Sequence, residues 1–533
     1  MGAGGAGGGR GGWQAELQGF EGELWTEGEQ GYAPALRAAA AANAAAGRRR
    51  PELLARPSGP DDVCRCVRAA QARARDGGLP TSTPPLSVRG GGHSDLCLLD
   101  GALAVDLSWG MKWVECDPRS CIVRCGGGAT LAALQRAAGK HGMACPVGLH
   151  DTVGVGLLLQ GGVGRLSRRF GLAVDNLLGV QLVTASGDIV ALGQGFESIP
   201  GVGGGGKLHR KDEMERDLWW CARGAGPNFG IVTAVALRAF QVGPVLHGRV
   251  PCSFPRGISL ESTAGALAQF EEAARLLPRN QQVDCVLGLT SEGHPTGAFF
   301  PCSLDGQPFE RSIIRAMGLA DGEGRGPGCP TGYFKRGSFR SIPYPTLEGL
   351  SAPEHSSELG GARGSGAGGS TSMQTKVVAY VRQCFVDRLG AAGWLALLRA
   401  MEAAPSGMAE IMLQHAGGEV RAFTSDSVAF APRSWEFSVV VVACWKESSE
   451  QARRENEAWA DAAFYSLQPF TTGLYAADID PLRRPGSVAA EVHGAFQGNL
   501  PRLAGLKQRH DPDGLFRGTC PLLPLRSTTQ PRL

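Results

Sequence analysis

The sequence of 533 residues contains no long hydrophobic run, no block of charge of one sign and no Cys-x-x-Cys pair. Its apolar stretches, such as Val439–Trp445, are far shorter than the roughly 20 residues that a membrane-spanning helix needs. The 53 basic and 50 acidic residues are spread along the chain, whereas a nucleic-acid-binding surface concentrates basic residues. These absences favour a soluble protein that binds neither nucleic acid nor membrane.

The 15 cysteines are scattered, and no histidine lies at zinc-ligand spacing from the local groups Cys64/Cys66 and Cys116/Cys121/Cys125. We therefore expect free thiols in a reducing compartment and no metal site. The first ten residues are mostly glycine and lack the charged and apolar regions of a secretory signal. The sequence thus predicts a soluble intracellular protein and leaves the compartment open.

The most informative segment runs from Val88 to Ser94 and reads Val-Arg-Gly-Gly-Gly-His-Ser. Three successive glycines let the backbone adopt positive φ and approach a ligand with no Cβ in the way. Consecutive N–H groups in such a turn can form an anion-binding nest suited to a diphosphate. His93 directly follows the glycines, where it can contact the organic part of the same ligand. Because the chain has 79 glycines, this heptad gains weight only together with other motifs.

Further motifs follow in a fixed order: Thr152–Gly156, Gly161–Gly164, Leu166–Leu172, Asp175–Leu178, Asn228–Thr233 and, near the end, Gly498–Leu503 and Leu506–Phe516. Read with the His93 heptad, this series resembles the FAD-linked oxidoreductases with a PCMH-type FAD-binding domain, in particular the berberine bridge enzyme-like group. The resemblance extends over most of residues 20–520. It implies that FAD is the cofactor and that His93 carries it covalently. His150 stands where members with two covalent links carry a cysteine, so a single link is expected.

The resemblance also implies which residues bind the cofactor. They are Arg89, Gly90, Gly91, Gly92, His93, Ser94, Thr152, Val153, Gly154, Gly156, Gly161, Gly164, Asp175, Asn176, Gly230, Ile231, Val232 and Asn499.

The fold class implied is α+β and two-lobed: a flavin domain, a substrate domain with an antiparallel sheet, and a C-terminal segment that returns to the flavin domain. The boundaries predicted are a glycine-rich tail over 1–19, a lead-in helix segment over 20–46, the flavin domain over 47–241, the substrate domain over 242–484 and the returning segment over 485–525. A chain of this length exceeds the roughly 250–300 residues of a single core, which agrees with two domains.

Periodicity predicts the local structure. We expect helices over 35–46, 61–71 and 131–142, and strands over 86–88, 102–107, 121–125, 376–381, 410–414 and 436–445. The Gly/Ser-biased stretches 201–217 and 351–372 have no periodicity and are expected to be loop insertions. Gly201–Lys207 fits a phosphate-binding loop, but Leu208 stands where that motif needs Ser or Thr, so we attribute the match to composition.

Tyr475 is the candidate catalytic residue, because relatives use a tyrosine in a Tyr-x-Asn segment as a base. Here Ala477 replaces the asparagine, and Phe496 and Val163 stand where relatives often carry tyrosines. The leading prediction is an FAD-dependent oxidoreductase that oxidises an alcohol, sugar or amine by hydride transfer, with O₂ or another acceptor. Two alternatives stay open: a flavin-binding protein with little catalysis, and an aldonolactone-type oxidase of the same flavin superfamily.

Overall fold

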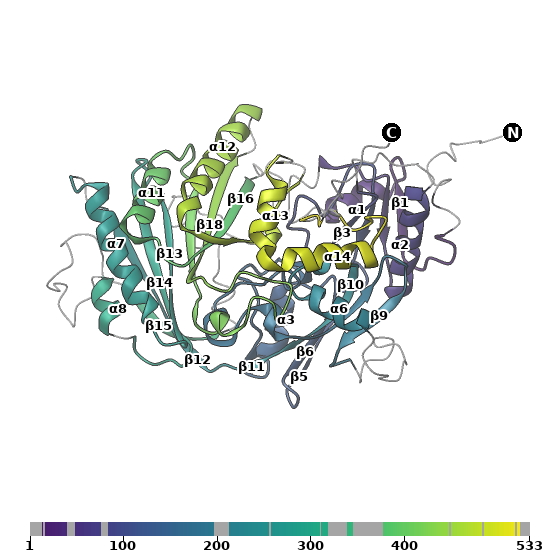
Figure 1. Cartoon of the computed structure of the whole chain (residues 1–533), viewed down its shortest axis with the longest axis horizontal. Helices are drawn as coiled ribbons and strands as arrows, with labels where there is room; N and C mark the ends of the chain where they lie inside the picture. Colours follow the sequence, from purple (N-terminus) through teal and green to yellow (C-terminus); the bar gives the residue numbers. More distant parts are fainter. Residues whose placement is uncertain are drawn as a thin grey trace.

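A computed structural model describes residues 13, 16–39, 48–75, 84–196, 213–254, 257–309, 311–317, 338–344, 377–446, 449–481, 484, 486–517 and 520–522. Two lobes lie side by side, with the N-terminal half on the right of Figure 1 and a large sheet with its helices on the left. Helices and mostly antiparallel sheets make up both lobes. The expected two-lobed α+β fold is therefore confirmed.

The first sheet of the N-terminal lobe has the strand order β1 (Glu23–Thr26), β2 (Leu53–Arg56), β4 (Leu103–Asp106) and β3 (Leu86–Arg89). Strands β2, β4 and β3 are parallel, and helices α1 (Tyr32–Ala39) and α2 (Pro60–Arg75) belong to the same part of the lobe. Pro60 opens α2, where its missing N–H does no harm, and the carboxylates of Asp61 and Asp62 favour the first turn. The apolar residues of α2 recur at helical spacing and are buried: Val63, Cys66, Val67 and Ala70.

The second sheet of this lobe has the order β5 (Val114–Asp117), β6 (Ile122–Gly126), β10 (Ile231–Arg238), β8 (Leu177–Val183) and β9 (Ile189–Gly193). Helices α3 (Leu131–Gly139), α4 (Ser167–Phe170), α5 (Ala173–Asn176) and α6 (Glu213–Ala222) connect or flank its strands. Strands β7 (Met143–Ala144) and β11 (Phe240–Gln241) pair just before the chain enters the other lobe.

The other lobe contains one antiparallel sheet of eight strands. Their order is β15 (Ser338–Pro343), β12 (Pro244–Ser253), β14 (Pro295–Ser303), β13 (Gln281–Leu289), β17 (Glu410–His415), β18 (Phe437–Lys446), β16 (Val377–Val386) and β19 (Thr471–Leu474). Helices α7 (Leu260–Arg275), α8 (Arg311–Ala316), α11 (Gly390–Glu402) and α12 (Glu450–Ser466) lie on its outer side in Figure 1. Every second residue of the strands packs under these helices, so the alternate residues face the other way.

The chain returns to the first lobe through α13 (Val488–Phe496) and α14 (Leu500–His510), the yellow helices of Figure 1. Lys507 on α14 is buried, and its ammonium group donates to the Asn228 carbonyl at 2.7 Å and to the Asp511 carboxylate at 2.6 Å. The Phe516 carbonyl is the third acceptor of this buried ammonium group. These three bonds hold the C-terminal segment on the N-terminal lobe, which is called the flavin lobe below after the domain expected there.

Some sequence expectations differ from the structure. The expected loop over 201–217 is wrong for its last residues, because α6 begins at Glu213; Leu218 and Cys221 of that helix are buried, and the charged run before it conceals the apolar spacing. The expected helix over 35–46 begins earlier, at Tyr32, and the described part ends at Ala39. Residues 197–212, including the predicted phosphate-loop match, and the predicted loop 351–372 lie outside the described residues.

Among the described residues, no helix has both the length and the apolar character needed to cross a membrane. The 14 cysteines in this part of the chain carry free thiols.

Candidate functional site

The glycine turn lies where two parallel strands end. Strands β3 and β4 are paired in register, Arg89 opposite Asp106, so the segments that follow them leave the sheet at the same edge. The Arg89 guanidinium contacts the buried Asp106 carboxylate at 3.2 Å and donates to the Ala39 carbonyl at 3.0 Å. Asp106 in turn accepts from the Ser108 hydroxyl at 2.7 Å. The charge of Arg89 is thus used to fix the base of the turn.

Three glycine segments meet at this edge. A Cβ on Gly91 would lie 2.3 Å from the nitrogen of Gly154, so only glycines allow the two backbones to approach this closely. Gly154 also bridges to Thr130, which follows the second triple glycine, Gly126–Gly128. The predicted cofactor-binding residues do not include this second triplet, although a strand ending in Gly-Gly-Gly is the same signal that indicated the first one.

His93 points its Nε2 atom at the Thr152 hydroxyl, 2.6 Å away. Burial lowers the pKa of His93 to about 4, with nearby His150 and Arg89 acting in the same direction. The imidazole is therefore neutral near pH 7 and keeps a lone pair. The contact with Thr152 fixes the orientation of the ring beside the glycine turn. The ring of His150 lies 6.3 Å from the ring of His93, centroid to centroid.

Tyr475 lies at a second glycine turn of the flavin lobe. Its hydroxyl accepts a hydrogen bond from the Gly162 N–H at 2.9 Å, and a Cβ on Gly161 would come within 2.7 Å of its ring. The ring makes edge contacts with Phe385 and Phe430 of the other lobe. Burial raises the pKa of Tyr475, while the backbone N–H groups of Gly162 and Val163 lower it. Tyr475 therefore joins the eight-stranded sheet to the Gly161–Gly164 turn.

Several residues predicted to bind the cofactor use their polar groups for contacts within the protein. Asp175 forms two hydrogen bonds with Arg433 and accepts from the Leu172 N–H. Asn176 donates to the Phe170 and Leu172 carbonyls, and Asn499 donates to three carbonyls of residues 425–429. Asp175 and Asn499 thus join segments of the two halves of the chain, whereas Asn176 holds the turn before its own strand.

The remaining predicted residues are mainly backbone positions. Gly164 packs against the Val147 carbonyl, and Gly156 has open space around it. Gly230, Ile231 and Val232 lead into β10, where the Val232 carbonyl lies under Gly127. The structure thus brings residues 89–94, 126–128, 152–154 and 232 together.

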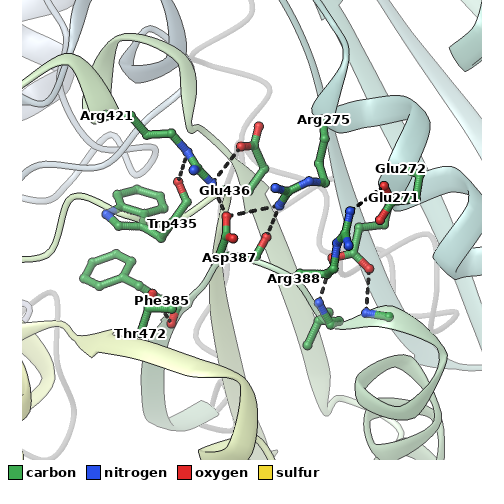
Figure 2. Close-up of polar contacts among 12 residues, drawn as sticks. Glu271, Glu272, Arg275, Phe385, Asp387, Arg388, Arg421, Trp435, Glu436 and Thr472 are labelled. Atoms are coloured by element: carbon green, nitrogen blue, oxygen red, sulfur yellow. Dashed lines mark hydrogen bonds and ion pairs between the residues drawn. The ribbon is translucent and has the colours of Figure 1, made fainter.

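A second polar centre lies where α4 meets the sheet of the other lobe. Arg168 on α4 is buried and donates to the carbonyls of Ala416 and Leu277 and to the Glu436 carboxylate, each at 2.6 Å. Figure 2 shows how Glu436 and Asp387 share the guanidinium group of Arg421, while Arg275 also contacts Asp387. These groups border a hollow of about 430 Å³ that is lined by Arg168, Arg275, Arg279, Arg421 and Glu436.

The arginines of this hollow are already paired with carboxylates, Arg279 with Glu419 among them. The network also reaches into the sheet: His415 contacts Glu436 through Nε2 at 3.0 Å and accepts from the Val283 N–H through Nδ1. Burial lowers the pKa of His415 to about 4, so it is neutral near pH 7. The arginines of the hollow are therefore used in ion pairs, and the pair of Arg168 with Glu436 joins the two lobes.

The glycine turn at His93 lies within a region that resembles known FAD binding domains. Residues 51–193 match the family model described as an FAD binding domain. The chain is 32% identical over 274 residues to (R)-6-hydroxynicotine oxidase of Paenarthrobacter nicotinovorans, which is 51% of this chain and 53% of that protein. The alignment therefore spans about half the length of that relative.

Solved structures match over nearly the whole chain. The structure of 6-hydroxy-D-nicotine oxidase from Arthrobacter nicotinovorans has a TM-score of 0.71 and 24% identity, covering 95% of this chain and 98% of that one. The berberine bridge enzyme from Eschscholzia californica has a TM-score of 0.70 and 17% identity, covering 94% and 97%. At these identities the matches establish a shared fold.

Proposed function

We propose that the chain is an FAD-linked oxidoreductase of the berberine bridge enzyme-like type, that it holds FAD covalently through His93 and that it oxidises a small-molecule alcohol, sugar or amine. A match to an FAD binding domain and the fold shared with the berberine bridge enzyme support this proposal. A bound flavin accepts a hydride from the substrate and passes the electrons to O₂ or another acceptor. The relative named (R)-6-hydroxynicotine oxidase supports this class of reaction.

The position of His93 is the observation that carries the proposal, because it directly follows the glycine turn and its ring contacts the Thr152 hydroxyl. A ring nitrogen must be unprotonated to bond to carbon, and burial holds the pKa of His93 near 4. Thr152 fixes the ring through Nε2, beside the glycines of the turn. The glycines on either side provide backbone N–H groups and clear space for a diphosphate-linked ligand. These residues fit FAD, and the sequence-based list 89–94 and 152–154 remains our assignment of the cofactor site.

His150 supports a single covalent link. It stands where a thiol would be needed for a second link, and the nearest thiol in sequence, Cys145, is fully buried with a raised pKa. A buried, protonated thiol is a poor nucleophile.

Tyr475 is our candidate for the proton acceptor with hydroxyl substrates. Its hydroxyl already accepts from the Gly162 N–H, and that bond stabilises a phenolate more than a phenol. Burial still holds the pKa of Tyr475 above its ordinary value, so the bound cofactor or substrate must lower that pKa before the phenol can give up its proton and accept another. The positions of Val163 and Phe496 carry no phenol and are packed in apolar cores. A flavin-binding protein with weak catalysis is therefore the second candidate function, and the aldonolactone-type oxidase is a third within the same superfamily.

The test is the absorbance of the purified full-length protein before and after acid precipitation. We expect the flavin to remain with the precipitated polypeptide in the wild type and in a His141→Ala control, and to appear in the supernatant for His93→Ala. Flavin released from the wild type would refute the covalent link. Bleaching of the flavin by any of a panel of alcohols, sugars and amines separates the oxidoreductase from the weakly catalytic alternative.

A further inference from the structure

The inner face of the eight-stranded sheet is defined by the alternation of its residues. Ile411, Val441 and Ala443 pack under the outer helices, so Glu410, Met412 and Val442 project from the opposite face. Phe385 of β16 lies on that same opposite face and packs against Val163, Leu172 and Tyr475. The face that carries Glu410 is therefore the face that meets the flavin lobe.

On this face, side chains that are paired across β17, β18 and β16 form rows, and the solvent exposure of a row increases with its distance from Phe385. The row of Gln414, Ser438 and Phe385 contains two buried residues, and the row of Glu410, Val442 and Val381 is partly exposed throughout. Four residues along a strand separate the two rows, which is about 13 Å. The stretch between them is comparable in length to a small organic molecule.

Among the described residues, Glu410 is the one carboxylate in the partly exposed row of this inner face. Directly across from it on β18 is Val442, whose partner on β16 is Val381, and its nearest same-face neighbour on β17 is Met412. In the described part of the chain no hydrogen bond or ion pair involves the Glu410 carboxylate. Carboxylates in such apolar surroundings are normally paired with a cation or a donor.

The pKa of Glu410 agrees with these apolar surroundings. Burial raises the pKa of Glu410 to about 7, and burial is its sole cause. The titratable group that interacts with Glu410 from β18 is Cys444, whose own pKa burial and the Glu410 charge raise to about 11. Cys444 is therefore a neutral thiol at pH 7 and contributes no counter-charge. Glu410 is poised to exchange a proton near neutral pH.

We propose that Glu410 is the substrate-recognition residue of this face, that it pairs with the ammonium group of an apolar amine substrate, and that it accepts one proton from that group. The proposal rests on the proposed flavin-dependent oxidation and narrows its substrate class. In the proton step the ammonium loses one N–H proton to the carboxylate, which gives a neutral amine and a carboxylic acid. A neutral amine is the form whose adjacent C–H bond can be oxidised, because its nitrogen lone pair can form the new C=N bond.

The surroundings favour an amine over a sugar. Met412, Val442 and Val381 offer apolar surface and no hydrogen-bond donors, whereas a sugar ring needs several donors and acceptors around it. Gln383, the polar side chain nearest to this row on β16, already donates to the Ser438 hydroxyl. An aryl or alkyl amine matches one carboxylate in an apolar wall.

A binding experiment tests the charge separately from turnover. The flavin-loaded full chain is titrated with benzyltrimethylammonium and with neopentylbenzene, its uncharged analogue of nearly the same shape. We expect the wild type to bind the cation more tightly, and Glu410→Gln to weaken cation binding by about 10-fold or more, since the variant removes the charge that attracts the cation in apolar surroundings. Glu410→Asp should restore part of the affinity, and Glu402→Gln on the exposed side of α11 should leave it unchanged. Cation affinity of the wild type should rise as the pH increases through about 7, when the carboxylate forms.

Turnover is then compared for N-methylbenzylamine and benzyl alcohol. Preference for the amine that is lost in Glu410→Gln supports the proposal. Equal binding of the cation and its uncharged analogue by the wild type, or unchanged cation binding by a folded Glu410→Gln variant, would overturn it. A wild-type protein that lacks flavin or oxidises no substrate would instead refute the proposed function, while the binding comparison still decides the role of Glu410.

Discussion

The ion pair of Asp175 and Arg433 gives the most direct test of how the lobes are held together. Asp175 belongs to α5 of the flavin lobe and Arg433 to the segment before β18, and their side chains are 0% and 5% exposed. Both guanidinium NH₂ groups donate to the carboxylate, at 2.8 and 2.9 Å. Arg433 also lies over the rings of Phe423 and Phe430. The pair is therefore buried, bidentate and between lobes.

Replacement of Arg433 by methionine keeps most of the apolar contact with the two rings and removes the charge. Asp175 is then left buried with the Leu172 N–H as its remaining donor. Breaking a buried pair in this way costs about 3–5 kcal/mol. Since Leu172 still donates, we expect a loss near the lower end, about 3 kcal/mol. The double variant Arg433→Met/Asp175→Asn should lose less than the sum of the two single variants, because it leaves no unpaired charge.

The assay is hydrogen exchange of the backbone amides of residues 166–178, combined with calorimetric unfolding, because a two-lobed chain does not unfold in a single step. Faster exchange in this segment with little change in α7 would localise the effect to the junction. Arg453→Met is the matched control, since that arginine forms exposed pairs within α12 and should change stability by less than about 0.5 kcal/mol. A loss below about 1 kcal/mol for Arg433→Met, or strict additivity in the double variant, would refute the reasoning.

Three further predictions follow from the sites. Peptide mapping of the holoprotein should find flavin on the peptide that contains His93 and on no cysteine peptide; a flavinylated Cys145 peptide would contradict the single link. Tyr475→Phe should slow flavin reduction by an alcohol ~10²–10⁴-fold, as expected for loss of a general base. It should slow reduction by an amine by less than about threefold, because Glu410 takes the ammonium proton. Rapid-mixing absorbance measures both rates, and equal effects on the two substrates would contradict separate proton acceptors for alcohols and amines. Glu410→Gln should match the wild type in stability at pH 4 and exceed it by on the order of 2 kcal/mol above pH 8. The folded-state pKa of about 7 lies above the unfolded value of 4.5, so ionisation of the carboxylate destabilises the folded wild type as the pH rises. Thermal unfolding of both proteins at the two pH values checks the sign.

Local sequence signals predicted the elements that depend on neighbouring residues. The helical spacing behind Pro60 gave α2, and a strand followed by three glycines gave the turn at His93. These features follow from backbone preferences and from the period of buried residues, both of which act over a few positions. The beginning of α6 was missed because charged residues at its first turn conceal the buried face of that helix. The resemblance to a flavin-linked family, carried by motifs in a fixed order, supplied the two-lobed fold that the structure confirms.

Contacts between distant segments could not be predicted in this way. The sequence does not indicate that Asp175 pairs with Arg433, which lies 258 residues further along the chain. The alternation in Glu410–His415 shows that one face of the strand is buried, yet only the pairing of β17 with its neighbours decides that Glu410 faces the flavin lobe. The hydroxyl of Tyr475 meets the Gly162 N–H across 313 positions. The sequence by itself determined the glycine turn, the neutral attachment histidine as a candidate and the class of cofactor, because these depend on residues next to one another. The tertiary structure decided which polar side chains join the lobes, because burial and ion pairing depend on segments that meet only in the folded chain.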